Sequence, residues 1–366
     1  MGVMSKQLYD KLFGPRAPCK QLHWAFDESC MKFIWTFYSN TFIGCVKFFL
    51  PLSILQICLN YKHLDGPLLL EFLKTFLSRT SSYILGCYLM FSWNCTLSNI
   101  FGGVTFYELA LMPGFLAGFF SLIGTRRARI LDVLLEFIMV LETIIRRAQY
   151  HDILKVTDIR LTTIFALNNA LLIYLLTHRN KEENLPLTFW FYVPSSVQNK
   201  MLPCSHKTHC LKYCLEGMIK QPQLLVQLLR SSKNLNLGYF LCTYVGINRA
   251  LTCYLCGRRN FSPVYSSLIA GLLSGLSFRI EPNLQLFCLG ITTSLQLIYA
   301  KLEQKFTRLR KIPTLLPLQL ICNGVLSHER LLAPDICPKY YMNLGSMLTC
   351  GQIDKLCETM FQKSLR

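Results

Sequence analysis

Charged side chains are scarce in this sequence, and acidic ones are the scarcest. Only 16% of the 366 residues are charged, and 20 Asp and Glu stand against 38 Lys and Arg, which leaves a formal net charge of +18. Hydrophobic residues make up 52% of the chain. A soluble chain of this length normally carries more charge and fewer apolar residues. The composition therefore favours a membrane protein.

Motifs of the common enzyme classes are missing as well. The chain has no Gly-x-Ser-x-Gly elbow, no phosphate-binding loop and no dinucleotide fingerprint. His328 and Glu329 are adjacent in "SHERLL", but no second histidine follows at the spacing that a metalloprotease requires. We therefore expect a protein that is not an enzyme, and interpret these two residues as polar groups at the membrane edge.

Long basic stripes are also absent. Lys and Arg form short runs that follow apolar stretches, as in "TRRARI", "IIRRAQ" and "CGRRNF". Runs of this kind are typical of loops beside anionic lipid headgroups. Nucleic-acid binding would need a continuous basic face, often with aromatic residues. We expect the lipid bilayer as a partner and no nucleic acid.

Apolar runs, in contrast, are abundant. A segment of roughly 17 to 25 apolar residues can cross the hydrocarbon core of a bilayer. The candidates are residues 33–59, 80–97, 106–124, 130–145, 161–177, 237–256, 264–280, 284–300 and, more weakly, 313–326. A further stretch, residues 211–230, mixes charged residues with leucines, as helices that lie on a membrane surface do. The sequence predicts an all-α polytopic membrane protein with about eight spans and one interfacial amphipathic helix.

One glycine-spaced phrase occurs twice, as "PGFLAGFFSLI" and again as "AGLLSGLSFRI". Within each copy two glycines are four residues apart, so they share one helix face on which a second helix can approach closely. These helix-packing glycines are Gly114, Gly118, Gly271 and Gly275.

The repeated phrase also indicates how the chain is organised. Each copy follows a Tyr- and Cys-rich apolar run and precedes another apolar run. We therefore expect a first membrane half at residues 1–178, an extramembrane linker at 179–220 and a second membrane half at 221–366. Facing repeats of this kind build a central path or groove in many transporters.

Several polar residues fall inside the apolar runs. Carboxylates within a membrane span are costly and are often functional. One interpretation is a polar path between the repeats for a small solute or ion, and the other, for the acidic residues alone, is ion pairing with nearby arginines. The residues concerned are Asp132, Glu136, Glu142, Asn168 and Asn169.

Cysteine and histidine cluster before the first long apolar run of each half. The amino-terminal cluster contains Cys19, His23 and Cys30. Thiolate and imidazole ligands at close spacing can hold a structural zinc, although neither cluster has two separated Cys-x-x-Cys pairs. A disulfide framework and unpaired packing cysteines are the alternatives. The second cluster, which offers more than four donors, consists of Cys204, His206, His209, Cys210 and Cys214.

Five blocks taken together resemble a known family. They are the Cys19 to Cys30 interval, "PGFLAGFFSLIGTRRAR" with the later "LETIIRR", "CSHKTHCLKYCLEGMIK", "SSLIAGLLSGLSF" and "HERLLAPDICPKYY". In their order they resemble the transmembrane protein 135 family, over nearly the whole chain.

The resemblance implies a non-enzymatic multi-pass protein of mitochondrial or peroxisomal membranes. It further implies roles in mitochondrial fission, peroxisome organisation and lipid homeostasis. Glycine-rich repeats similar to those of the mitochondrial inner-membrane translocase family are part of that expectation, as are bound lipid and other organelle membrane proteins as partners. The alternative that the residues leave open is a transporter or channel for a small solute or lipid.

Overall fold

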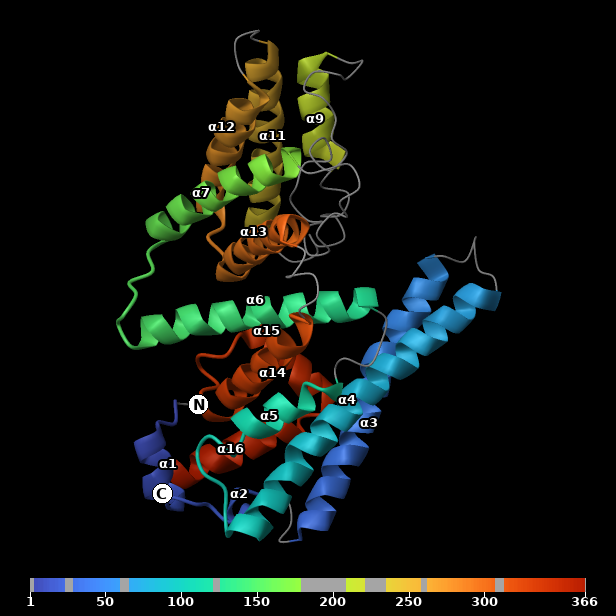
Figure 1. Ribbon diagram of the computed structural model, residues 1–366, viewed down its shortest axis with the longest axis vertical. Helices are drawn as coiled ribbons and strands as arrows, with labels where there is room; N and C mark the ends of the chain where they lie inside the picture. The colour runs from blue at the N-terminus through green and yellow to red at the C-terminus, as the bar shows by residue number, and fades with distance from the viewer. Residues whose placement is uncertain are drawn as a thin grey trace. The chain divides into compact units, whose positions relative to one another are not determined.

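The computed structural model is built of helices (Figure 1). It describes residues 3–23, 29–59, 66–120, 126–178, 209–220, 235–257, 262–306 and 313–365. These ranges contain no β-strand, only an isolated bridge between Ala17 and Val104. The prediction of an all-α fold is confirmed. The chain divides into two compact units: residues 1–151 with 313–366 form unit 1, and residues 152–312 form unit 2.

Unit 1 is organised around a long helical pair and a packed group of shorter helices. Its helices are α1 (Lys6–Phe13), α2 (Cys19–Leu22), α3 (Cys30–Leu59), α4 (Gly66–Phe101), α5 (Leu111–Ala117), α6 (Arg126–Tyr150), α14 (Leu315–Leu332), α15 (Lys339–Leu348) and α16 (Gln352–Leu365). Helices α3 and α4 lie side by side (Figure 1), and α14 packs against both α5 and α6. Helix α3 is continuous through Pro51, so the first apolar run forms one helix.

The core of unit 1 joins segments from both ends of the chain. Tyr9 is fully buried, and its hydroxyl donates a hydrogen bond of 2.9 Å to the carbonyl oxygen of Val104. The backbone N–H of Met4 donates to the carbonyl oxygen of Leu332 at 2.7 Å. Aromatic rings of α3 and α4 complete the same apolar cluster with residues of α16. The amino-terminal segment is therefore held by contacts with the carboxyl-terminal segment.

Unit 2 contains the second group of helices. They are α7 (Asp158–Thr177), α9 (Cys210–Lys220), α11 (Leu235–Gly257), α12 (Pro263–Gly275), the 3₁₀ helix η4 (Leu276–Ile280) and α13 (Leu284–Lys305). Helix α7 packs against α12 and α13, and α11 packs against α9 and α12. Phe165 of α7 stacks on Phe278 of η4 with ring centroids 4.1 Å apart.

The two compact units do not coincide with the expected halves at residues 1–178 and 221–366. Residues 313–366 pack with the amino-terminal unit because α14 meets α5 and α6. Helix α7, in contrast, belongs to unit 2 because it packs against α12 and α13. The two sequence halves are therefore interleaved. Most of the expected linker, residues 179–208, lies outside the described residues.

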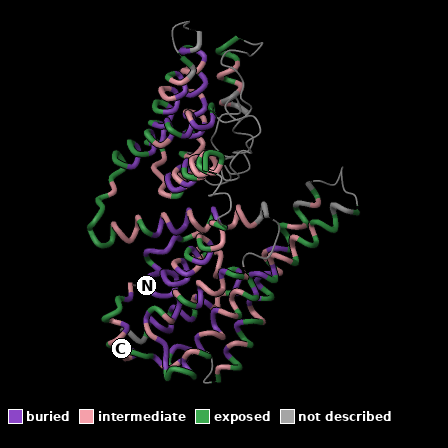
Figure 2. The backbone as a smooth tube through the Cα atoms, in the orientation of Figure 1, coloured by how far each residue is buried: buried purple, intermediate pink, exposed green. Residues whose placement is uncertain are grey.

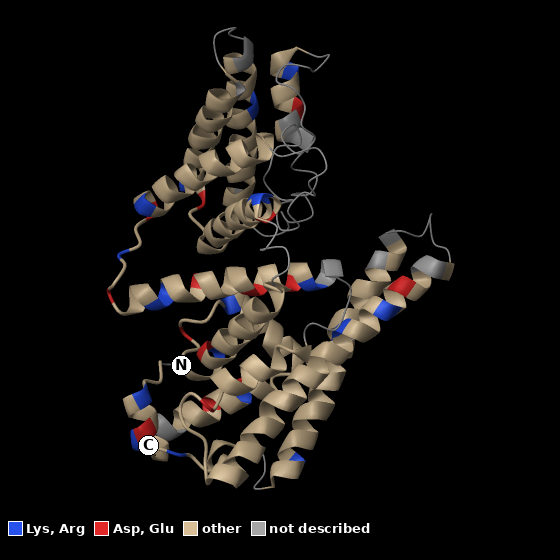
Figure 3. Cartoon of the chain, in the orientation of Figure 1, with Lys and Arg blue, Asp and Glu red and all other residues tan. Residues whose placement is uncertain are grey.

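Within the described ranges, two helices are long and apolar enough to cross a membrane: Cys30–Leu55 in α3 and Asp158–Thr177 in α7. The prediction of about eight spans is not confirmed. Helix α5, in the predicted span 106–124, has seven residues. Helix α6, in the predicted span 130–145, carries many of the charged residues of unit 1 (Figure 3).

Candidate metal centre and charged cavity

The first glycine pair lies where α5 approaches α14. A Cβ atom added to Gly114 would lie 2.5 Å from the Cβ of Ser327, and one added to Gly118 would lie 3.1 Å from the Cα of Leu320. Both distances are shorter than the roughly 3.5 to 4.0 Å of an ordinary carbon contact. Glycine therefore allows α5 to lie directly against α14.

The second glycine pair has the same role in unit 2, where α12 meets α7. A Cβ on Gly271 would lie 2.8 Å from the Cα of Ala170, and one on Gly275 would lie 2.6 Å from the Cα of Ala166. In both units a glycine helix from one sequence half contacts a helix from the other half. Each of these close contacts therefore joins the two sequence halves, and each lies inside one compact unit.

The residues that were predicted to form a polar path belong to different compact units. Asp132, Glu136 and Glu142 lie on α6 in unit 1, whereas Asn168 and Asn169 lie on α7 in unit 2.

In unit 1, Glu142 is already paired. It receives a charge-assisted hydrogen bond from Arg146 at 2.7 Å and another hydrogen bond from the hydroxyl of Tyr340 at 3.1 Å. Ion pairing with an arginine on the same helix, one of the two sequence interpretations, thus describes Glu142.

In unit 2, Asn169 holds three helices together. Its Nδ2 donates to the carbonyl oxygen of Gly271 on α12 at 2.6 Å, and its Oδ1 accepts from the hydroxyl of Tyr244 on α11 at 2.8 Å. The side chain is fully buried. These bonds satisfy both ends of the amide, so Asn169 has a packing role that its place in the sequence did not reveal.

Asp132 and Glu136, in contrast, line a cavity of about 150 Å³ inside unit 1. Arg79 of α4 and Asn323 of α14 lie in the same wall. A single water molecule needs only roughly 10 to 15 Å³ of such volume, so a larger molecule can enter. The sequence offered no sign that Arg79 would join the two carboxylates.

Charged residues of α14 form a second buried group next to this cavity. Glu329 is buried and forms an ion pair with Arg147 of α6. His328 is 7% exposed, and its ring stacks on that of Tyr107. Burial, together with the nearby charge of Arg147, lowers the pKa of His328 to about 4. Burial raises the pKa of Glu329, against the opposing effect of Arg147. Both side chains are buried within unit 1.

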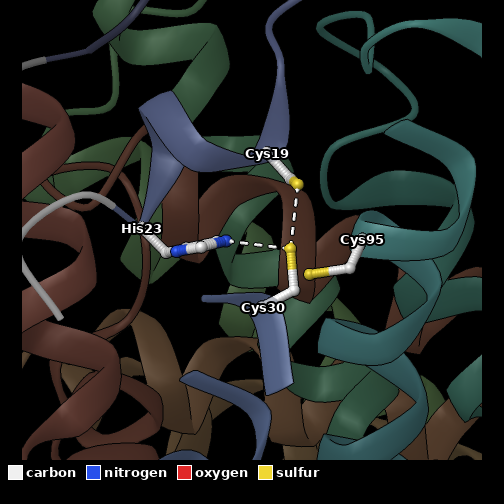
Figure 4. A group of neighbouring side chains, drawn as sticks. All are labelled: Cys19, His23, Cys30 and Cys95. Atoms are coloured by element: carbon white, nitrogen blue, oxygen red, sulfur yellow. Dashed lines mark hydrogen bonds between the residues drawn. The ribbon is translucent and has the colours of Figure 1, made fainter. Parts of the chain in front are cut away.

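The described residues include a compact group of metal-ligand side chains, shown in Figure 4. It joins Cys19, His23 and Cys30, which the sequence had placed in one cluster, to Cys95, which it had not. One possible ligand atom from each of the four residues lies within 4.8 Å of the others. Cys95 gave no signal in the sequence because it lies far along the chain, near the end of the apolar run at residues 80–97.

Local structure fixes each of these side chains. Cys19 begins α2, and its backbone N–H donates to the hydroxyl of Ser98 on α4 at 2.8 Å. His23 caps the end of α2, and its ring stacks on Phe33 with centroids 4.6 Å apart. Cys30 begins α3. The short α2, the start of α3 and the long α4 thereby bring donors from three segments to one point.

The distances suit a tetrahedral metal. The Sγ atoms of Cys19 and Cys30 are 3.3 Å apart, and Nε2 of His23 is 3.5 Å from Sγ of Cys30. Zinc–sulfur bonds of about 2.3 Å place neighbouring ligands roughly 3.8 Å apart. Cys19, His23 and Cys95 are each at most 5% exposed, and a buried set of three thiols and one imidazole has the donor chemistry of a closed structural zinc site.

The second predicted metal cluster is only partly described. Cys204 and His206 lie outside the described residues. His209 and Cys210 are exposed at the start of α9, and Cys214 follows one turn later, where its thiol interacts with Cys253 of α11. A metal site at this cluster remains a prediction.

No known family model matches this chain. No solved structure matches it either.

Proposed function

We propose that this chain is a polytopic, non-enzymatic organelle membrane protein that supports mitochondrial fission, peroxisome organisation and lipid homeostasis. The observation that supports membrane insertion is the apolar outer face of α3. Only 22% of the residues in its apolar stretch are buried, and much of α3 is coloured exposed or intermediate in Figure 2. Its exposed side chains include Trp35, Phe42, Ile43 and Ile54. A helix buried in a soluble core would cover these groups, whereas lipid would cover them in a bilayer.

The organelle and the cellular role rest on the resemblance of the sequence blocks to the transmembrane protein 135 family. In this proposal the remaining apolar runs bring the total to about eight spans. The protein lies in mitochondrial or peroxisomal membranes, where its partners are bound lipid and other organelle membrane proteins. The close glycine contacts of α5 and α12 keep its helices packed together.

A pair of lysine substitutions on α3 tests the membrane part of the proposal. Ile43→Lys places a charge near the middle of the apolar stretch, where it costs about 2.5 to 3.5 kcal/mol on insertion. Met31→Lys is the matched control, because Met31 is 77% exposed at the helix end, where a lysine can reach the headgroups. We expect carbonate-resistant membrane retention to fall for Ile43→Lys alone. Equal retention of both variants would contradict the proposal.

Imaging of the tagged protein tests the organelle part. We expect overlap with mitochondrial or peroxisomal markers. Signal confined to the secretory pathway would contradict it.

A transporter or channel for a small solute or lipid is the second candidate function. The charged cavity favours it, because Asp132 and Glu136 line the same enclosed space. Uptake into liposomes that is saturable, and that Glu136→Gln abolishes, would support transport. Lipid binding without any flux would exclude it and favour the first candidate.

For the metal centre, we propose that Cys19, His23, Cys30 and Cys95 hold a structural zinc. The metal would tie the start of α3 and the short α2 to α4. Metal analysis of protein purified under reducing conditions should find about one zinc per chain. Cys95→Ser should lose it, whereas Cys87→Ser, on the same helix but outside the group, should keep it. Equal and negligible zinc in both variants and in the parent protein would refute the assignment.

A further inference from the structure

The cavity of unit 1 has a mixed wall of charged and apolar side chains. It lies between α4, α6, α14 and α15, and all its lining residues belong to unit 1. Met90, Met139 and Leu344 contribute apolar surface. A molecule held here would therefore meet both kinds of surface at once.

Opposite charges face this space without pairing with each other. The Nε atom of Arg79 is buried and has no hydrogen-bond partner. Asp132 lies close enough to feel the charge of Arg79, yet the ion pairs of the described residues do not include one between them. A buried polar atom left without a partner destabilises the folded protein. A ligand that bonds to Arg79 and Asp132 together would remove this effect.

Glu136 provides a second carboxylate next to Asp132, and one of its two oxygens can still accept a hydrogen bond. The side-chain amides of Gln319 and Asn323 donate to Oε2 of Glu136 at 2.8 and 3.0 Å. Both bonds end on the same oxygen, so Oε1 keeps its capacity to accept from a ligand. Asp132 and Glu136 together suit a primary ammonium group.

The terminal nitrogens of the other arginine in the wall are already committed, although its Nε atom, like that of Arg79, has no hydrogen-bond partner. Arg330 donates to the carbonyl oxygens of Tyr341 and Met342 at 2.8 and 2.9 Å, and to a carboxylate oxygen of Asp354 at 3.3 Å. Arg79 therefore remains as the group that can bind an anion. Two carboxylates would repel a simple anion, and the arginine would repel a simple metal cation.

We infer that this cavity binds a small zwitterion, with an anionic phosphate or carboxylate on Arg79 and a primary ammonium group between Asp132 and Glu136. The apolar wall accommodates the carbon chain that links these groups. Such a ligand is either a free zwitterion or the headgroup of an aminophospholipid. This deepens the proposed lipid or solute role, and it rests on that proposal only for the source of the ligand.

Binding to the purified full-length protein in phospholipid-free detergent tests the inference. The probes are phosphoethanolamine and a short-chain phosphatidylethanolamine, and ethyl phosphate is the control that lacks the ammonium group. Affinity is measured by native mass spectrometry and by the shift in thermal unfolding. We expect ethyl phosphate to bind at least about tenfold more weakly than the better zwitterion, because it loses a charge-assisted contact.

Two substitutions locate the site. Arg79→Gln and Asp132→Asn should each weaken binding about tenfold or more, and Lys74→Gln, an exposed change on the same helix, should leave it unaltered. If a variant fails to fold, the comparison of the two zwitterions with ethyl phosphate on the parent protein still tests whether the ammonium group contributes to binding. Binding of phosphoethanolamine assigns a free zwitterion, and binding of the lipid alone assigns a headgroup.

The inference is overturned if neither zwitterion binds, if ethyl phosphate binds equally well, or if the folded variants bind like the parent protein. These measurements need no bilayer. Failure of zwitterion binding is thus separate from failure of the Ile43→Lys membrane test, which would overturn the membrane proposal alone.

Discussion

Replacing Gly275 with alanine sets two opposing effects against each other. The backbone of Gly275 is helical, with φ −62°, so alanine should stabilise α12 by up to about 1 kcal/mol. The new Cβ, however, would lie 2.6 Å from the Cα of Ala166 and 3.2 Å from the Cβ of Asn169. The Cα of Ala166 can move away only if α7 moves with it. Overpacking of this kind lowers the free energy of unfolding by about 1 to 3 kcal/mol. We expect a net loss of about 1 to 2 kcal/mol.

Thermal unfolding of the purified protein in detergent, followed by intrinsic fluorescence, measures this loss. A decrease of about 2 to 8 °C in Tm corresponds to it. Gly86→Ala on α4 is the matched control, because its Cβ would lie 3.9 Å from the nearest atom, the Cβ of Ala117. The control should keep or raise the Tm. A rise in both variants would refute the argument that α12 and α7 need a glycine where they meet.

Three further predictions concern buried polar groups. His328 stays neutral in the folded protein down to pH about 4, whereas in the unfolded chain it binds a proton near pH 6.5. The stability that the neutral form contributes above pH 6.5 should therefore decrease as the pH falls toward 4. Denaturant unfolding across this pH range should show a smaller decrease for His328→Phe. Burial raises the pKa of Cys357 to about 12. Maleimide at neutral pH should therefore label the exposed Cys350 first and Cys357 only after denaturation. Peptide mass spectrometry measures this order of labelling. Asn169→Ala should cost about 1 to 3 kcal/mol, because it removes two buried hydrogen bonds, one with the hydroxyl of Tyr244 and one with the carbonyl oxygen of Gly271; an unchanged Tm would contradict that.

Long uninterrupted apolar runs made several helices predictable from the sequence. The run at residues 237–256 lies within α11 (Leu235–Gly257), and the run at 284–300 begins where α13 (Leu284–Lys305) begins. The run at 106–124 failed because Gly102 and Gly103 adopt positive φ just before it and the described helix there ends at Ala117. Composition over a window cannot detect such a local break.

The sequence could not predict which distant helices pack against each other. The packing of α14 against α5 and α6 depends on contacts such as that of Gly118 with Leu320, which no local pattern encodes. The metal group shows the same limit. Three of its members stand within one short interval, but Cys95 and the cavity residue Arg79 each join their sites only because α4 passes beside them.

Because unit 1 is assembled from residues 1–151 and 313–366, its order of synthesis matters. The ribosome adds roughly 5 to 20 residues per second, so the whole of unit 2 is made during the roughly ten to thirty seconds between the two parts. During this delay α5 and α6 are made but α14, which packs against them, is not. The backbone N–H of Met4 also lacks its acceptor, the carbonyl oxygen of Leu332. The four metal ligands, in contrast, all emerge by Cys95, so metal can secure the early helices before the last segment arrives. Loss of that segment should therefore leave a nascent chain with α5 and α6 exposed, which is a substrate for chaperones and proteases.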